Sequence, residues 1–139
     1  MSRVNHVGLC VTDLARSRRF YEEVFGFAHR RDLPVPDAAA ARLLRVPEPV
    51  GLTAAYLERE GFVLELLHFA RAGNDPARAR SFTEPGLTHL SFTVADVAAT
   101  CARVAERGGE VLADTDMGGR AVMVRDPDGQ LLELMPEAG

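Results

Sequence analysis

Two histidines lie at matching positions of a repeated segment, and an imidazole can bind a metal ion or transfer a proton near neutral pH. The segment "NHVGLCVTDL" (5–14) superposes on "THLSFTVADV" (88–97) at an offset of 83 residues, which aligns His6 with His89. A buried strand has no structural need for an imidazole. The repetition therefore points to chemistry.

Two glutamates repeat in the same way near the ends of the two copies. The segment "EREGFVLELLHF" (58–69) superposes on "DPDGQLLELMPE" (126–137) at an offset of 68 residues, which aligns Glu65 with Glu133. Each glutamate stands four residues after a turn glycine and falls in the second strand of a predicted hairpin. Because an unpaired buried carboxylate is costly, proteins pair such groups or use them as ligands.

Two imidazoles and two carboxylates around one point would bind a divalent first-row ion and leave positions open for water or substrate. The alternative is a salt-bridged structural pair without metal. The remaining histidines are not expected to join the site, because His68 alternates to the face opposite Glu65 and His29 follows a helix end. The predicted metal ligands are His6, Glu65, His89 and Glu133.

The elements that must position these residues form a strand, a helix and three strands, twice. Asp13 and Asp96 can cap the two helices, which are predicted to stop at Gly26 and Gly108. The change of offset from 83 to 68 means that the first copy has 15 extra residues, which we place in the Pro-rich stretch 32–51 with its short helical pattern. We expect a single domain over 1–139, with a first module at 4–70, a link at 71–86 and a second module at 87–136.

Alternation along the strands predicts one face that packs on the helices and one that carries the histidines and glutamates. The predicted pocket positions on the second face are Cys10, Leu67, Thr93 and Met135. They include no aromatic residue, and the chain has no Trp. A trough that sequesters a large aromatic drug would need aromatic walls, so an enzyme is favoured over a non-catalytic sequestering protein.

The composition of the chain limits the kinds of partner that we expect it to bind. The net charge is −4 and basic residues do not gather along one face, which argues against nucleic acid. No stretch approaches the roughly 20 apolar residues that a membrane-spanning helix needs, and the first residues do not resemble a signal peptide. We expect a soluble, cytoplasmic protein that acts on a small molecule.

The two modules, with a histidine at the first strand of each and a "DPDG" hairpin followed by "LLELMP", resemble the vicinal oxygen chelate superfamily. This superfamily includes glyoxalase I, methylmalonyl-CoA epimerase, extradiol dioxygenases and the fosfomycin and bleomycin resistance proteins. The resemblance implies an α+β fold in which two βαβββ modules pair into a curved eight-stranded sheet that encloses a cup. It also implies one divalent ion per site (Ni, Co, Zn, Mn or Fe), a substrate with neighbouring oxygens, and a homodimer.

By this resemblance the chain is a metal-dependent lyase, isomerase or epimerase that removes a proton next to a carbonyl and forms a metal-stabilised enolate. Glu133 would be the base, and Glu48 in "VPEPVG" is a second candidate. Cys10 occupies the position where glyoxalase I usually has an arginine that helps to hold glutathione, which argues against lactoylglutathione lyase activity. The alternatives are an extradiol-type dioxygenase, in which Glu65 would be a surplus ligand, and an antibiotic-sequestering protein.

Overall fold

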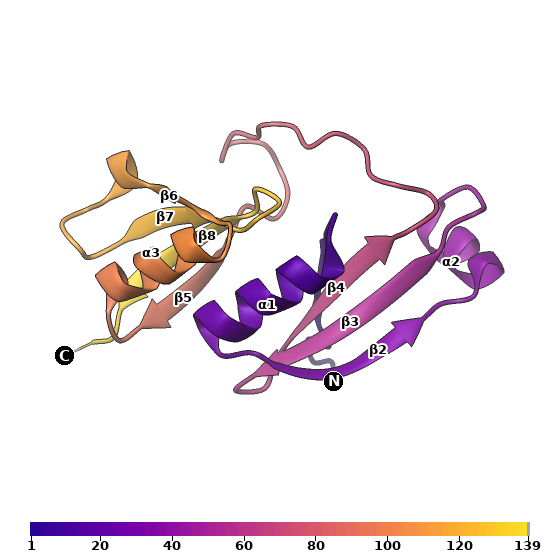
Figure 1. Cartoon of the computed structure of the whole chain (residues 1–139), viewed down its shortest axis with the longest axis horizontal. Coiled ribbons are helices and arrows are strands. Elements are labelled where there is room, and N and C mark those ends of the chain that lie inside the picture. The colour runs from indigo at the N-terminus through magenta and orange to yellow at the C-terminus, as the bar shows by residue number, and fades with distance from the viewer. Residues whose placement is uncertain (139) are drawn as a thin grey trace. The chain divides into compact units, whose positions relative to one another are not determined.

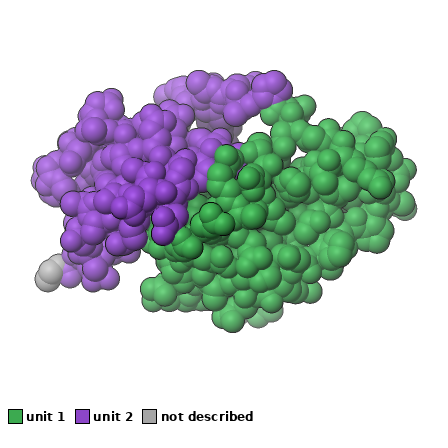
Figure 2. Space-filling model, in the orientation of Figure 1, with its two compact units in different colours: residues 1–75 green, residues 76–139 purple. Residues whose placement is uncertain are grey.

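The computed structural model describes residues 1–138. The chain forms two compact units that divide after Asp75, inside the segment expected to be a link (Figure 2). Each unit contains one four-stranded sheet and one βαβββ module, which confirms the predicted α+β class (Figure 1). No helix among the described residues has the length and apolarity needed to cross a membrane.

The first unit has the predicted order of elements, and the short helical pattern of the insertion forms a helix (Figure 1). Its elements are β1 (Val7–Cys10), α1 (Leu14–Phe25), β2 (Ala28–Pro34), α2 (Asp37–Leu44), β3 (Leu52–Arg59) and β4 (Phe62–Phe69). The strand order is β1-β4-β3-β2, with β1 parallel to β4 and the other pairs antiparallel. The first and last strands of the module are therefore neighbours.

The second unit repeats this arrangement. Its elements are β5 (Leu90–Val94), α3 (Val97–Glu106), β6 (Glu110–Leu112), the short 3-10 helix η1 (Ala113–Thr115), β7 (Val122–Arg125) and β8 (Leu131–Pro136). The strand order is β5-β8-β7-β6, again with the first strand parallel to the last. This shared topology places the histidine-bearing end of each module beside its glutamate-bearing strand.

The helix caps show how closely the two copies match. Asp13 and Asp96 have the same backbone angles, φ −138° and ψ 104°, and each accepts a hydrogen bond from the backbone N–H three residues later. α1 ends at Gly26 in the left-handed conformation (φ 74°), as predicted. α3 ends slightly before the predicted stop, and Gly108 (φ 88°) turns the chain there.

Each main helix covers one face of its own sheet. The largest fully buried side chains of the first unit are on α1, β3 and β4, and include Phe20, Tyr21, Leu57, Leu64 and Leu66. Those of the second unit include Val104, Val124, Leu132 and Leu134. Burying each such side chain stabilises the fold by about 1.5–3 kcal/mol before opposing terms are counted. The opposite face of each sheet remains available for the histidines and glutamates.

Candidate functional site

The first unit brings His6 and Glu65 together. Nε2 of His6 lies 3.4 Å from Oε1 of Glu65, and the side chains are 34% and 13% exposed. His6 stands one residue before β1, so the strand begins slightly later than predicted. Glu65 lies opposite Gly8, and its Oε1 would be 3.5 Å from a Cβ added there. Glu65 therefore lies directly above Gly8, at a distance that would still accommodate a small side chain.

The second unit builds the equivalent pair from His89 and Glu133. Nε2 of His89 lies 3.8 Å from Oε1 of Glu133, and the side chains are 30% and 27% exposed. His89 stands one residue before β5, and Glu133 lies opposite Ser91. The two pairs thus come from equivalent elements of the two modules and have similar geometry.

The second ring nitrogen of each histidine is held by the preceding residue. Asn5 Oδ1 lies 2.6 Å from Nδ1 of His6, and Thr88 Oγ1 lies 2.8 Å from Nδ1 of His89. When Nδ1–H donates to these oxygens, the lone pair of Nε2 faces the glutamate and is free to bind a metal.

The donor atoms of each unit lie near the separation that two ligands of one first-row ion require. Two ligands about 2.0–2.2 Å from one ion lie roughly 3–3.5 Å apart. The separation of 3.4 Å in the first unit is within this range, and that of 3.8 Å in the second unit exceeds it by about 0.3 Å, so the second pair would have to move slightly closer to bind an ion. Within residues 1–138, no three His, Cys, Asp or Glu side chains cluster closely enough to hold an ion. Each unit by itself therefore supplies half of the predicted ligand set.

Glu65 is supported by a row of polar side chains across its sheet. Tyr56 on β3 lies opposite Glu65, and a hydrogen bond to that carboxylate is the main cause that raises the pKa of Tyr56. The ring of Tyr56 meets the His6 ring edge-on, with centroids 5.9 Å apart. The guanidinium carbon of Arg31 on β2 lies 4.8 Å from the Tyr56 ring centroid.

Glu133 has a different support. Ser91 Oγ donates to Glu133 Oε1 at 2.8 Å and also lies 3.7 Å from Sδ of Met135. The residues that continue this row across the sheet are Met123 and Leu112, which are apolar. The second unit thus lacks the tyrosine and the arginine of the first row.

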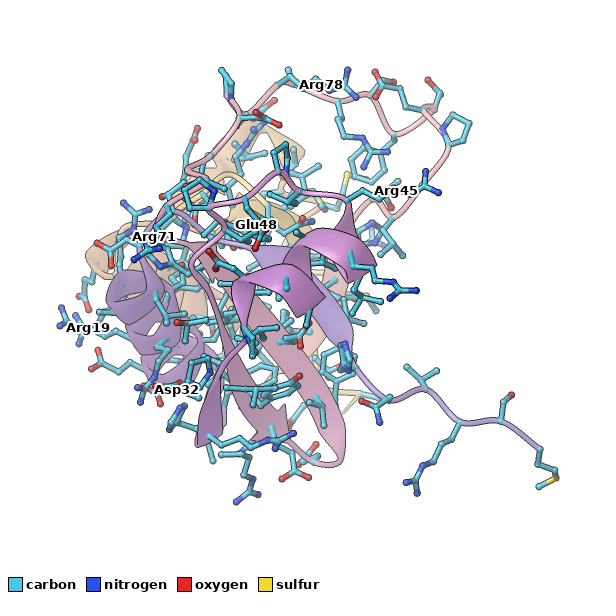
Figure 3. The ribbon with its side chains drawn as sticks, turned by 90° about the vertical axis from the view of Figure 1, so that its right-hand side faces the viewer. Arg19, Asp32, Arg45, Glu48, Arg71 and Arg78 are labelled. Carbon is cyan, nitrogen blue, oxygen red and sulfur yellow. The ribbon has the colours of Figure 1, made fainter. Side chains whose placement is uncertain are left out.

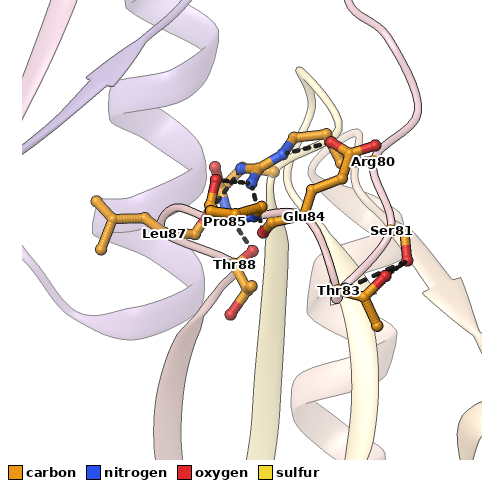
Figure 4. A network of polar contacts seen from close by, with 8 residues as sticks. Arg80, Ser81, Thr83, Glu84, Pro85, Leu87 and Thr88 are labelled. Carbon is orange, nitrogen blue, oxygen red and sulfur yellow. Dashed lines mark hydrogen bonds and ion pairs between the residues drawn. The ribbon is translucent and has the colours of Figure 1, made fainter.

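A loop before β5 supports His89. The ring centroid of Phe82 lies 5.5 Å from that of His89. Arg80 connects residues within this loop: its Nη1 donates to the carbonyl of Leu87 at 2.6 Å, and its Nε donates to Glu84 at 3.4 Å (Figure 4). Part of the predicted link is therefore an ordered support for a candidate ligand.

The four predicted pocket positions form two neighbouring pairs, Cys10 with Leu67 and Thr93 with Met135. Cys10 is exposed and its Sγ accepts a hydrogen bond from Asn74 at 3.3 Å. These positions share the faces of the glutamates, as alternation predicts.

The insertion limits one end of the face that carries Glu65. Leu67 packs against a small cluster formed by Ala40, Val50 and Leu52. Asp37 at the start of α2 accepts backbone hydrogen bonds from Gly51 at 2.9 Å and from Val50 at 3.3 Å; the bond from Gly51 is the main cause that lowers its pKa. These hydrogen bonds hold the start of α2 against the residues that lead into β3.

Glu48 is exposed in the loop between α2 and β3 (Figure 3). Its role as a second base stays a prediction. Sequence reasoning missed Asn5, Tyr56 and Ser91. Asn5 precedes one of the two repeated histidines. Tyr56 and Ser91 lie opposite a glutamate on the neighbouring strand, and only the strand register shows this.

The family is established by comparison with known proteins. The model of the Glyoxalase/Bleomycin resistance protein/Dioxygenase superfamily matches residues 3–134, and the chain belongs to this family. Lactoylglutathione lyase from Pseudomonas aeruginosa is 30% identical over 94% of this chain and 80% of that protein. Probable lactoylglutathione lyase from Vibrio parahaemolyticus is 30% identical over 96% of this chain and 89% of that protein.

Solved structures share the fold. A glyoxalase family protein from Bacillus cereus has a TM-score of 0.84 at 20% identity, covering 100% of this chain and 96% of that one. The trypanothione-dependent glyoxalase I of Leishmania major has a TM-score of 0.71 at 25% identity, covering 99% and 88%. A fosfomycin resistance protein from Listeria monocytogenes, solved with Mn(II) and sulfate, has a TM-score of 0.66 at 17% identity, covering 99% and 94%.

Proposed function

We propose that this protein is a metal-dependent enzyme of the glyoxalase type, which moves a proton at a carbon next to a carbonyl. The observation that carries the proposal is the matched pair in each unit, with imidazole Nε2 facing carboxylate Oε1 at 3.4 and 3.8 Å. The proposed ligands of one divalent ion per site are His6, Glu65, His89 and Glu133. When bound, the ion supplies Lewis-acid stabilisation of the negative charge that develops on the substrate oxygen.

Glu133 is the proposed base. Its side chain is 27% exposed and that of Glu65 is 13% exposed, so Glu133 is the more accessible carboxylate. Glu65 is held by a hydrogen bond from Tyr56, and this bond is the main cause that raises the pKa of Tyr56. The hydroxyl of Ser91 orients Glu133 while leaving its second oxygen to take a proton. Return of the proton to a different carbon would give isomerisation, and return to the same carbon epimerisation.

The test combines metal analysis with hydrogen exchange in deuterated water. The screened compounds are 2-oxo acids, acyl-CoA esters, keto sugars and lactoylglutathione, the last because of the names of the two bacterial relatives. With a compound that exchanges, Glu133→Gln should keep its metal and lose exchange by about 10² or more, the scale of general-base loss. Glu65→Gln is the matched control and should weaken metal binding more than Glu133→Gln does.

Unchanged exchange in Glu133→Gln would move the base to Glu65 or Glu48. Oxygen consumption without exchange would instead favour the dioxygenase alternative. Absence of bound metal in the purified and metal-treated protein would overturn the proposal.

We also propose that the protein acts as a homodimer. β1 and β2 are the edge strands of one sheet, and β5 and β6 are those of the other. Edge strands expose backbone groups that can pair with another chain. Light scattering should give a mass of about twice 15.1 kDa; the monomer mass at micromolar concentration would contradict this.

A further inference from the structure

Arg31 shares the face of Glu65 because β2 contains a bulge. His29 lies opposite Leu57 and Arg31 lies opposite Tyr56, so Arg30 is the extra residue. In a regular strand, residues two apart share a face, and Arg31 would then share the face of His29. The bulge reverses this alternation and turns Arg31 to the face that bears the candidate metal ligands.

Tyr56 holds the guanidinium of Arg31 near Glu65. Neighbouring strands are about 4.8 Å apart, so the backbone of Arg31 lies two strands, or roughly 10 Å, from Glu65. Its guanidinium carbon is 4.8 Å from the Tyr56 ring centroid, above the strand between them. Stacking on an aromatic ring restrains a guanidinium and leaves its N–H groups able to donate.

The charge of Arg31 is available to a ligand. Its neighbour Arg30 is neutralised by Glu58, with Nε 2.6 Å from Oε2. Arg31 has no ion pair with a carboxylate within residues 1–138, although it is exposed. The repeat-equivalent row of the second unit ends in Met123 and Leu112, so only the first unit has this positive group.

We propose that Arg31, seated on Tyr56, is an anion-binding subsite, and that the substrate carries a carboxylate or phosphate-like group besides its two neighbouring oxygens. This inference rests on the proposed metal-dependent function. A guanidinium binds such groups through two parallel hydrogen bonds, which gives direction as well as affinity. The subsite would orient the substrate with its acidic end toward β2.

The experiment uses hydroxamates, whose two neighbouring oxygens chelate metal ions. Calorimetry on the protein loaded with Ni²⁺ or Mn²⁺ compares alkyl hydroxamates with hydroxamates of equal chain length that end in a carboxylate or a phosphonate. Two to four methylene groups separate the ends. At low salt, the best acidic compound should bind about tenfold more tightly than its neutral counterpart, the scale of one charge-assisted contact, and salt should reduce this preference. The carboxylate and phosphonate series show which anion fits.

Arg31→Gln should abolish the preference and leave binding of the neutral hydroxamate unchanged. Arg30→Gln is the matched control, because it removes the same charge from the adjacent residue of the same strand, and it should keep the preference. Equal binding of acidic and neutral compounds by the unmodified protein, or a preference that survives in Arg31→Gln, would overturn the subsite. Failure of the neutral hydroxamates to bind would overturn the proposed metal function and the subsite with it.

Discussion

The two units of this protein present the same pair of candidate ligands in different surroundings. In the first, Glu65 is hydrogen-bonded to a tyrosine from β3 and is largely buried. In the second, Glu133 is hydrogen-bonded to Ser91 and is about twice as exposed. The ligand positions repeat and the side chains that hold them do not. Under the proposed function, this contrast would give the two copies separate roles, with Glu65 holding the ion and Glu133 exchanging protons.

The largest expected effect tests whether both units contribute equally to metal binding. His6→Ala and His89→Ala should each remove most of the bound metal, because each deletes one nitrogen ligand. Loss of a ligand should exceed the roughly 10–100-fold that loss of a ligand's hydrogen-bond partner costs. Metal analysis after dialysis measures the outcome. If both variants retain the metal content of the unmodified protein, the four-ligand site is wrong.

The next effect concerns the residues that hold Nδ1 of each histidine. Asn5→Ala and Thr88→Val should each weaken metal binding by about 10–100-fold, because the imidazole loses its fixed orientation. If the hydrogen bonds to Nδ1 are equivalent in the two units, the two variants should weaken metal binding to a similar extent. Competition with a metal chelator gives the affinities. Wild-type affinity in both variants would contradict the positioning role.

The supports of the two glutamates should separate the roles of the units. Tyr56→Phe removes the hydroxyl but keeps the ring, and should weaken metal binding about tenfold through Glu65. Ser91→Ala should lower the exchange rate more than metal affinity, because it acts on the proposed base. Titration of metal and deuterium exchange on the same samples compare the two. An identical pattern in both variants would remove the proposed division of roles.

Removal of the matched helix caps should have equal, moderate effects. Asp13→Ala and Asp96→Ala each delete a carboxylate that accepts a backbone hydrogen bond at the start of a helix, at 3.0 and 2.9 Å. Each should lower the free energy of unfolding by about 1 kcal/mol. Chemical denaturation measures this. Very unequal losses would show that the two helices contribute differently despite their equal caps.

The smallest expected effect is on stability, when the first unit is given the serine that the second unit has at the equivalent position. Gly8 occupies the place that Ser91 has in the second unit, and a Cβ there would contact Glu65 Oε1 at an ordinary 3.5 Å. Gly8→Ser should therefore be tolerated and raise stability by up to about 0.5–1 kcal/mol, since glycine weakens strands. Thermal unfolding measures the change. A clear loss of stability would show that Glu65 needs the space above Gly8.

The sequence by itself determined the repeated modules, the helix caps and the four candidate ligands. The reason is that these features follow from spacing along the chain. Asp13 and Asp96 are recognised as caps from their place before a helical pattern, and period-2 alternation assigns the two glutamates to one face of their strands. The family resemblance drawn from these residues was confirmed by the family model over residues 3–134.

Only the tertiary structure decided which side chains support those ligands. Tyr56 and Ser91 reach the glutamates across strands, and Phe82 reaches His89 from a loop with no pattern of its own. A bulge moved Arg31 to the ligand face, against simple alternation. Register and bulges depend on how strands pair, which involves residues far apart in the chain, so no local pattern of the sequence specifies them.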